Sequence, residues 1–195
     1  MSKNKILNDL VNASHQVSIK GLTPGKSGNI SCRFYEEGVS KVAITRSEIS
    51  KGKVGIDDIV IVDMEGNRLE GDGKPSSETF LHLGIYNERD DINAIVHTHS
   101  PHAAGFSMSG KELKRLEGFG KIENPYIASV KYSKPGSNEL AKDTARMMKK
   151  EDVVILKNHG VVAAGINLDE ATLLAEFIED IAKTQFIAHT LDLKP

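Results

Sequence analysis

Apolar residues recur at helical spacing near both ends of the chain. The first stretch predicts a helix over residues 6–19 that Gly21 closes, with apolar positions at Ile6, Leu7, Leu10, Val11, Val17 and Ile19. The last predicts a helix that Asn167 and Glu170 begin in a capping-box-like arrangement, with an apolar stripe of Leu174, Phe177, Ile178, Ile181 and Ala182. Two more helices are expected: one starts near Ser76, and one runs from a Ser137 cap to about residue 149.

Shorter apolar runs predict strands between these helices. Ile30, Cys32 and Phe34 alternate with polar residues, which is the pattern of a half-buried strand. Continuous apolar runs predict further strands over residues 42–44, 59–63, 94–99, 153–156 and 161–164. Helices and at least six strands in mixed order predict an α/β fold, in which helices cover a mixed or largely antiparallel sheet.

Length, charge and cysteine content exclude several kinds of protein and of binding site. A chain of 195 residues suits one domain, so we expect residues 1–195 to form a single domain. The formal net charge of −2 gives no electrostatic case for nucleic acid or an anionic membrane as a partner. One cysteine, Cys32, excludes an internal disulfide framework and a thiolate-cluster zinc site. With no signal peptide and no long apolar run in the sequence, we expect a cytoplasmic protein.

The sharpest chemical signal is His97-Thr98-His99 at the end of an apolar strand. Residues two apart on a strand project from the same face, so both imidazoles reach one metal ion, at about 2.0–2.1 Å for zinc. His159 ends a second apolar strand, and together the three histidines predict a metal site with one open position. Ordinary polar loop chemistry is the competing interpretation of a His-x-His sequence. The other histidines are interpreted as surface or packing residues (His15, His82, His189) or as out of phase with the pair (His102).

Two polar loops are candidate anion sites. In Pro75-Ser76-Ser77-Glu78 both serines are expected in the first turn of a helix, where hydroxyls and free backbone N–H groups bind phosphate well. If Glu78 faces the metal, it is a candidate general base. In Gly28-Asn29 the glycine allows close backbone approach, and the amide suits a phosphate or carbonyl oxygen. The alternatives are an ordinary helix cap and a simple turn before a strand.

These motifs together resemble a known family. The order and approximate spacing are those of the class II aldolase/adducin family, in the segments Gly28-Asn29-Ile30-Ser31, Ile44-Thr45-Arg46-Ser47, Lys74-Pro75-Ser76-Ser77-Glu78, His97-Thr98-His99 and Asn158-His159-Gly160. The resemblance covers residues 7–188 and is strongest to the fuculose-1-phosphate aldolase branch. No single motif is specific, but the five together are.

The resemblance implies a fold, an assembly and a chemistry. We expect three α/β/α layers and a homotetramer with active sites between subunits. The expected reaction cleaves a ketose 1-phosphate to dihydroxyacetone phosphate and a short aldehyde such as lactaldehyde, or forms it. The resemblance assigns one zinc ion to His97, His99 and His159, the acid/base role to Glu78, and the sugar phosphate to Gly28, Asn29, Ser47, Ser76 and Ser77.

The chain departs from the family pattern at two places. Glu48 stands where relatives have a glycine that contacts phosphate. A carboxylate at this place would repel the phosphate, and because both serines are retained we expect Glu48 to turn outward. Arg46 is expected to pair with Glu48 or to bind the phosphate directly. The family's tyrosine acid has no counterpart in the matching stretch near Gly118-Phe119; Tyr126 and Tyr132 are candidate substitutes.

Three alternatives stay open. The same scaffold serves pentose-phosphate 4-epimerases, methylthioribulose-phosphate dehydratases and sugar-acid phosphate decarboxylases. A Schiff-base aldolase is a weaker alternative, because the sequence isolates no lysine, Lys183 included, in an apolar pocket. A non-catalytic interaction module like the adducin head is weaker still, because such a binder has no need of three histidines and a glutamate together.

Overall fold

The computed structural model describes residues 2–116, 118 and 124–192, and in this part of the chain eight strands form one sheet. The order across the sheet is β4-β3-β2-β1-β5-β8-β7-β6. Only β6 and β7 pair in parallel among these strands, so the prediction of a mixed, largely antiparallel sheet is confirmed. The strands are β1 (Asn29–Glu36), β2 (Val39–Thr45), β3 (Ile59–Val62), β4 (Arg68–Glu70), β5 (Ala94–Thr98), β6 (Ala128–Val130), β7 (Val153–Leu156) and β8 (Gly160–Gly165).

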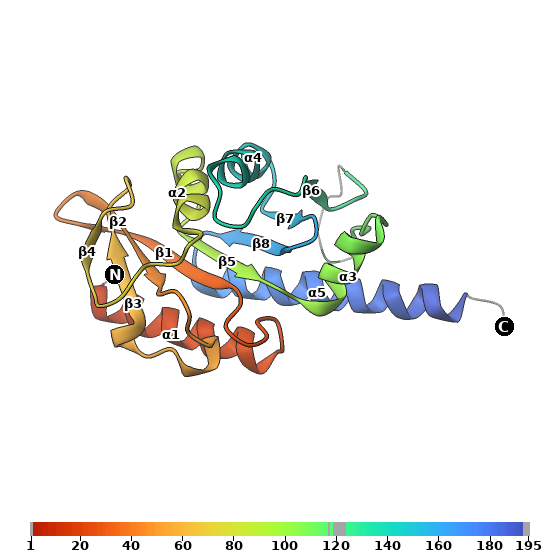
Figure 1. Ribbon diagram of the computed structural model, residues 1–195, viewed down its shortest axis with the longest axis horizontal. Helices are drawn as coiled ribbons and strands as arrows, with labels where there is room; N and C mark the ends of the chain where they lie inside the picture. Colours follow the sequence, from red (N-terminus) through yellow and green to blue (C-terminus); the bar gives the residue numbers. More distant parts are fainter. Residues whose placement is uncertain (1, 117, 119–123, 193–195) are drawn as a thin grey trace.

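Helices cover both faces of this sheet (Figure 1). The helices are α1 (Lys3–Ile19), α2 (Thr79–Glu88), α3 (Pro101–Ser109), α4 (Asn138–Met148) and α5 (Leu168–Leu191), with two 3-10 turns, η1 (Lys51–Lys53) and η2 (Ile56–Asp58). On one side α2 packs beside α4; on the other lie α1 and α5, with α3 against α5. None of the described helices is long and apolar enough to cross a membrane.

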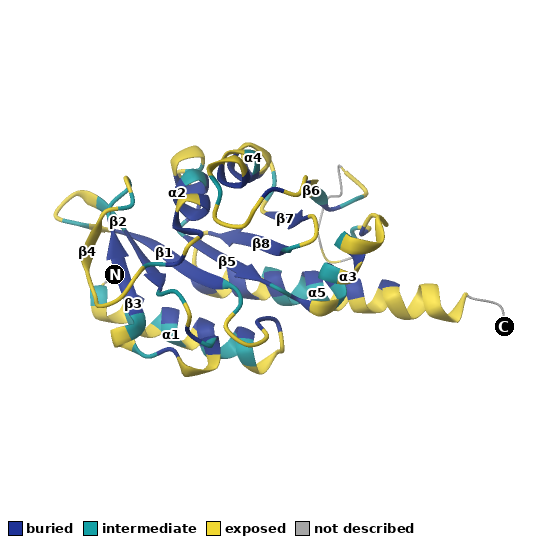
Figure 2. Ribbon diagram, in the orientation of Figure 1, coloured by how far each residue is buried: buried dark blue, intermediate teal, exposed yellow. Residues whose placement is uncertain are grey.

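The two helical layers enclose two apolar cores, one on each face of the sheet (Figure 2). Successive residues of β5 alternate between them: Ala94 and Val96 join α1 and α5, whereas Ile95 joins α2 and α4. This alternation follows from the pleat of a strand that is buried on both faces. The expected three-layer α/β/α fold is therefore confirmed.

Several ends and short elements differ from the predictions. Ser137 and Asn167 cap their helices as expected, by accepting hydrogen bonds from Leu140 N and Glu170 N. The second helix, however, begins at Thr79 and not near Ser76. A tight turn precedes it, in which the Ser76 carbonyl accepts a hydrogen bond from Thr79 N. The elements α3, β4 and β6 were not predicted, because each is short and lacks a clear apolar period.

Candidate active site

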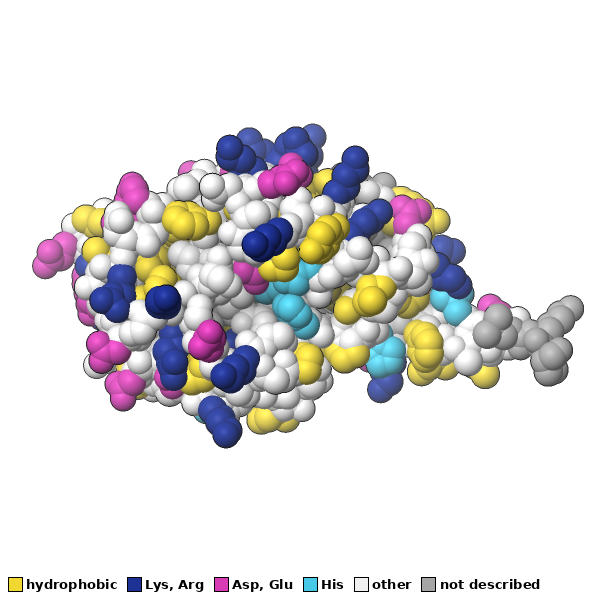
Figure 3. All heavy atoms as spheres, viewed as in Figure 1, with side chains coloured by type: hydrophobic (Ala, Val, Ile, Leu, Met, Phe, Trp, Pro, Cys, Tyr) yellow, Lys and Arg dark blue, Asp and Glu magenta, His cyan; other side chains and the backbone are white. Residues whose placement is uncertain are grey.

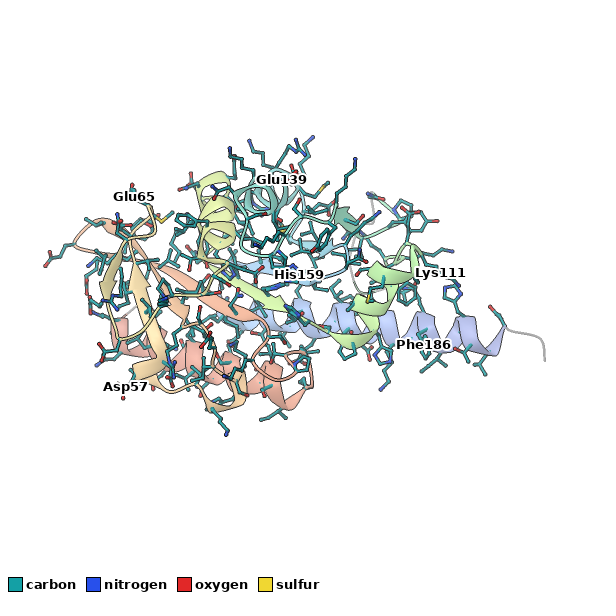
Figure 4. All side chains as sticks on the ribbon, in the orientation of Figure 1. Asp57, Glu65, Lys111, Glu139, His159 and Phe186 are labelled. Atoms are coloured by element: carbon teal, nitrogen blue, oxygen red, sulfur yellow. The ribbon has the colours of Figure 1, made fainter. Side chains whose placement is uncertain are left out.

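The predicted site residues meet where the central strands of the sheet begin or end. There β5 lies between β1 and β8, and Asn29 at the start of β1 pairs with His97 near the end of β5. On the other side His97 pairs with Val162 of β8, and His159 lies in the turn that leads into β8. Figure 4 shows His159 near the centre of the molecule. Strand order therefore brings together side chains that are far apart in the sequence.

Two glycines allow the strands to approach so closely. Gly28 has a φ of +70°, and a Cβ there would lie 2.5 Å from the backbone oxygen of His97. A Cβ at Gly160 would lie 2.1 Å from the backbone oxygen of Thr98. Both distances are shorter than any real contact, so only glycine fits beside the end of β5.

The three predicted metal ligands converge on one point. The Nε2 atom of His97 lies 3.2 Å from Nε2 of His99 and 3.3 Å from Nε2 of His159. In a tetrahedral site with metal–nitrogen bonds of about 2.05 Å, neighbouring nitrogens are about 3.3 Å apart. Both distances from His97 are thus those between neighbouring ligands of a zinc-sized tetrahedron. The ligand atoms of all three histidines lie within 4.8 Å of one another, so the cluster could hold a metal ion.

Glu78 occupies the remaining side of this cluster. Its Oε2 atom lies 3.1 Å from His97 Nε2, and its Oε1 atom lies 3.5 Å from His159 Nε2. The carboxylate is buried, and Oε1 has no hydrogen-bond partner among the described residues. A buried carboxylate oxygen without a partner is costly unless a cation satisfies it. The donor set therefore fits a divalent metal, with Glu78 beside the fourth position.

Burial and mutual charge set the protonation of these groups. Burial lowers the pKa of His99 to about 3 and that of His159 to about 4, so both imidazoles are neutral near pH 7. Burial also lowers the pKa of His97, but the adjacent Glu78 carboxylate outweighs it, and the net pKa is raised. Conversely, burial raises the pKa of Glu78 while His97 lowers it further, and the net pKa is lowered. His99 and His159 are therefore neutral beside an ionised carboxylate, the donor forms that a divalent metal requires, whereas His97 must lose its Nε2 proton when a metal binds.

A cavity of about 530 Å³ opens beside the cluster. Every predicted site residue except the fully buried His97 lines it, namely Gly28, Asn29, Ser47, Ser76, Ser77, Glu78, His99 and His159. Histidine side chains gather near the middle of this face, with basic side chains around them (Figure 3). The two serines differ, because Ser77 is exposed whereas Ser76 is buried and accepts a hydrogen bond from Glu78 N.

Three basic residues also line the cavity, and two of them differ from what the sequence suggested. Arg46 does not pair with Glu48; its Nε donates to Asp58 Oδ1 at 2.6 Å. Glu48 is exposed, but it also lines the cavity, so it does not turn away from the site as expected. Lys51 is only 1% exposed, a burial that the sequence did not indicate, although the cavity it lines is polar rather than apolar. Lys26, the third cation, is exposed.

Sequence reasoning missed two residues here. Lys51 lies in a polar segment without an apolar pattern, so nothing in the sequence indicated its burial. His82 was interpreted as a surface or packing residue; it is fully buried, but its Nε2 also lies 2.6 Å from Asn29 Oδ1, a contact with the site that was not expected. Its position on α2, four residues after Glu78, could have placed it on the same helix face.

The expected substitutes for the family's tyrosine acid do not reach this cavity within one chain. Neither Tyr126 nor Tyr132 lines it, and Tyr132 is exposed. Of the stretch that matches the family's tyrosine, Phe119 lies outside the described residues. The identity of the protonating acid therefore stays a prediction that involves a second subunit.

Comparisons with known proteins agree with this geometry. The family described as Class II Aldolase and Adducin N-terminal domain matches residues 8–186. An L-fuculose phosphate aldolase of Methanocaldococcus jannaschii is 43% identical over 159 residues, which are 82% of this chain and 83% of that protein. A 5-deoxy-D-ribulose 1-phosphate aldolase of Bacillus thuringiensis is 37% identical over 166 residues, or 85% and 77% of the two chains. A solved L-fuculose 1-phosphate aldolase has a TM-score of 0.86 at 31% identity and covers 99% of this chain and 90% of its own. The chain belongs to the class II aldolase/adducin family.

Proposed function

We propose that this chain is a zinc-dependent aldehyde-lyase that cleaves a ketose 1-phosphate to dihydroxyacetone phosphate and a short aldehyde such as lactaldehyde. The observation that carries the proposal is the convergence of His97, His99 and His159, whose ligand atoms lie within 4.8 Å of one another, with the Glu78 carboxylate beside them. The M. jannaschii and B. thuringiensis relatives, named as aldolases of an L-fuculose phosphate and of 5-deoxy-D-ribulose 1-phosphate, support a substrate of this class.

Each residue has a distinct role in this proposal. When bound, zinc acts as a Lewis acid on the carbonyl and neighbouring hydroxyl oxygens of the substrate. In synthesis Glu78, ionised and buried beside the ligands, takes the α-proton of dihydroxyacetone phosphate. In cleavage it returns that proton to the same carbon as the bond to the aldehyde carbon breaks, while the hydroxyl proton on the aldehyde carbon passes to the protonating acid. The hydroxyls of Ser76 and Ser77, the amide of Asn29 and the loop at Gly28 and Ser47 hold the phosphate and orient the substrate.

Product analysis tests this function directly. The purified protein, supplied with zinc, is incubated with L-fuculose 1-phosphate and with 5-deoxyribulose 1-phosphate, and the products are identified by mass spectrometry. We expect two fragments, one of them dihydroxyacetone phosphate. An epimer, loss of water or loss of carbon dioxide instead would assign another enzyme of the same scaffold.

Glu78→Gln is the matched variant for this assay. It keeps the size of the side chain and an oxygen that accepts from Asn29, so fold and metal content should be retained. Exchange of the donor's α-proton with solvent should fall about 10²–10⁴-fold, the usual contribution of a general base. Glu48→Gln, an exposed change beside the same cavity, is the control. Near-native exchange in Glu78→Gln would show that another group is the base.

A further inference from the structure

A chain of buried polar side chains runs from the core to the carboxylate of Glu78. Tyr86 OH lies 2.7 Å from Ser31 Oγ, and Ser31 Oγ lies 2.6 Å from His82 Nδ1. His82 Nε2 lies 2.6 Å from Asn29 Oδ1, and Asn29 Nδ2 lies 2.9 Å from Glu78 Oε2. All five residues are buried. Because buried polar groups are normally hydrogen-bonded, each polar hydrogen between these side chains can be assigned an acceptor.

The hydrogen bonds of this chain run in one direction. Glu78 Oε2 accepts from the amide nitrogen of Asn29, which turns the amide oxygen toward α2. An amide oxygen only accepts, so His82 carries its hydrogen on Nε2. Burial lowers the pKa of His82 to about 3, so the ring is neutral and Nδ1 accepts from Ser31. Ser31 in turn accepts from Tyr86.

We propose that His82 is a positioning residue that, through its Nε2–H group, holds the Asn29 amide with its nitrogen toward Glu78 and the cavity. His82 does not line the cavity, so it acts only through Asn29. In the described part of the chain it is the one donor to Asn29 Oδ1. A rotated amide would point an oxygen at the Glu78 carboxylate and at any bound phosphate, and would repel both.

The tautomer of His82 is measurable without any assay of function. In the ¹⁵N spectrum of the full-length, zinc-loaded protein, the resonances lost in His82→Gln identify the ring. Between pH 6 and 8 they should show a neutral ring with the hydrogen on Nε2. A hydrogen on Nδ1 would overturn the proposal, because Asn29 would then have to face the other way. This measurement stands even if the protein proves not to be an aldolase.

Two substitutions of His82 distinguish the loss of its hydrogen-bond donor from a change in packing. Gln places an amide nitrogen near the former Nε2 position and can donate to Asn29, whereas Asn reaches only the Nδ1 position. This step rests on the proposed function, because its readout is exchange of the donor's α-proton. His82→Asn should lose about 10- to 100-fold in exchange rate, the usual effect of a group that orients a site residue. His82→Gln should recover most of that loss.

Tyr86→Phe is the control for stability. It removes a buried hydroxyl from the far end of the chain, while Ser31 still donates to His82. We expect a lower melting temperature but exchange within about threefold of the original protein, because the Asn29 amide keeps its direction. Equal exchange rates in His82→Asn and His82→Gln would overturn the proposal, as would a loss in Tyr86→Phe as large as that in His82→Asn. If His82→Asn does not fold, the tautomer of the unaltered protein decides.

Discussion

His97 Nδ1 lies 2.9 Å from the carbonyl oxygen of Val161 on the neighbouring strand β8. Because a carbonyl oxygen only accepts, this contact fixes one hydrogen of His97 on Nδ1, so Nε2 is the atom that can bind a metal once it carries no proton. Nε2 is the atom that faces His99, His159 and Glu78. One strand pair thus orients the central ligand before any metal binds, as is usual for metal-binding histidines.

This orientation predicts one divalent metal ion per chain, and the three imidazole donors favour zinc. Changing His97, His99 or His159 to Ala should each remove the bound metal, as measured by elemental analysis after purification without chelator. His189→Ala, an exposed change on α5, should leave the metal content unchanged. The affinity of the protein for the metal should weaken at mildly acidic pH, because protons compete with the metal for the imidazoles. A protein that holds no metal and takes up no added zinc would contradict the assignment.

Gly28→Ala should damage the site, whereas Gly25→Ala in the same loop should not. Both glycines have a positive φ, so each substitution carries a backbone cost of about 1–2 kcal/mol. At Gly25 a new Cβ meets nothing within 4 Å, but at Gly28 it lies 2.5 Å from the backbone oxygen of His97. Gly28→Ala should therefore lose additional stability and metal affinity, measured by thermal unfolding and zinc titration. Equal effects of the two changes would show that contact with β5 does not matter.

The sequence predicted best those site residues that lie on an element with a regular apolar pattern. His97 and His99 could be placed on one face because β5 is an apolar strand with a period of two. The apolar periods of the long helices and central strands also predicted helices over a mixed, largely antiparallel sheet, whereas the three layers followed only from the family resemblance. The position of His159 beside the pair was inferred only from its place at another strand end and from family resemblance.

Other features depend on contacts that no local pattern encodes. Glu78 is placed by a turn before α2, and the serines lie in that turn and not in the helix as predicted. Lys51 is buried because its segment packs beside α1, where a Cβ at Gly52 would lie 2.8 Å from Ser18 Oγ. Long-range packing of this kind cannot be read from one polar segment.

The buried neutral ring of His82 predicts a specific dependence of stability on pH. Its pKa is about 3 in the folded protein, and the ordinary value is 6.5. The unfolded chain therefore binds a proton first, and stability falls as the pH drops from 6.5 toward 3. For the metal-free protein, His82→Gln should reduce the slope of unfolding free energy by about 1.4 kcal/mol per pH unit in this range. Denaturant titrations at pH 7, 6 and 5 measure the slope; an unchanged slope would mean that His82 is already charged when folded.

The C-terminal part of α5 extends beyond the sheet and predicts an assembly (Figure 1). Phe186, Ile187 and Leu191 expose large apolar side chains there, and Leu191 is 79% exposed. Such a surface on a projecting helix favours burial against another copy of the chain. Light scattering should report a homotetramer, the state that the family resemblance implies. Phe186→Glu should dissociate it, whereas Ile19→Glu at the exposed end of α1 should not. A fully active monomer would contradict an active site shared between subunits.

Lys51 predicts how the protein distinguishes a phosphorylated substrate from an unphosphorylated one. Its Nζ donates to the backbone oxygen of Ile49 at 2.7 Å, and it forms no ion pair with any described residue. Burial lowers its pKa to about 8, so it is still mostly a cation at pH 7. A buried cation that lines a cavity without a carboxylate partner favours an anionic ligand. Arg46, by contrast, already has Asp58 as its partner.

Lys51→Met should therefore raise the KM for dihydroxyacetone phosphate about 10- to 100-fold, the scale of a charged hydrogen bond. The KM for free dihydroxyacetone, a poor donor, should stay the same, and Arg46→Ala or Lys26→Met should change either value only slightly. In the original protein kcat/KM for the phosphorylated donor should fall as the pH rises through about 8, where Lys51 loses its charge. Lys51→Met should lack this step.

Because Met removes a buried charge but keeps the apolar stem, the Lys51→Met variant should melt no lower than the original protein. A loss of binding then cannot be attributed to unfolding. If Lys51→Met raises the KM for both donors equally, or for neither, Lys51 does not bind the phosphate.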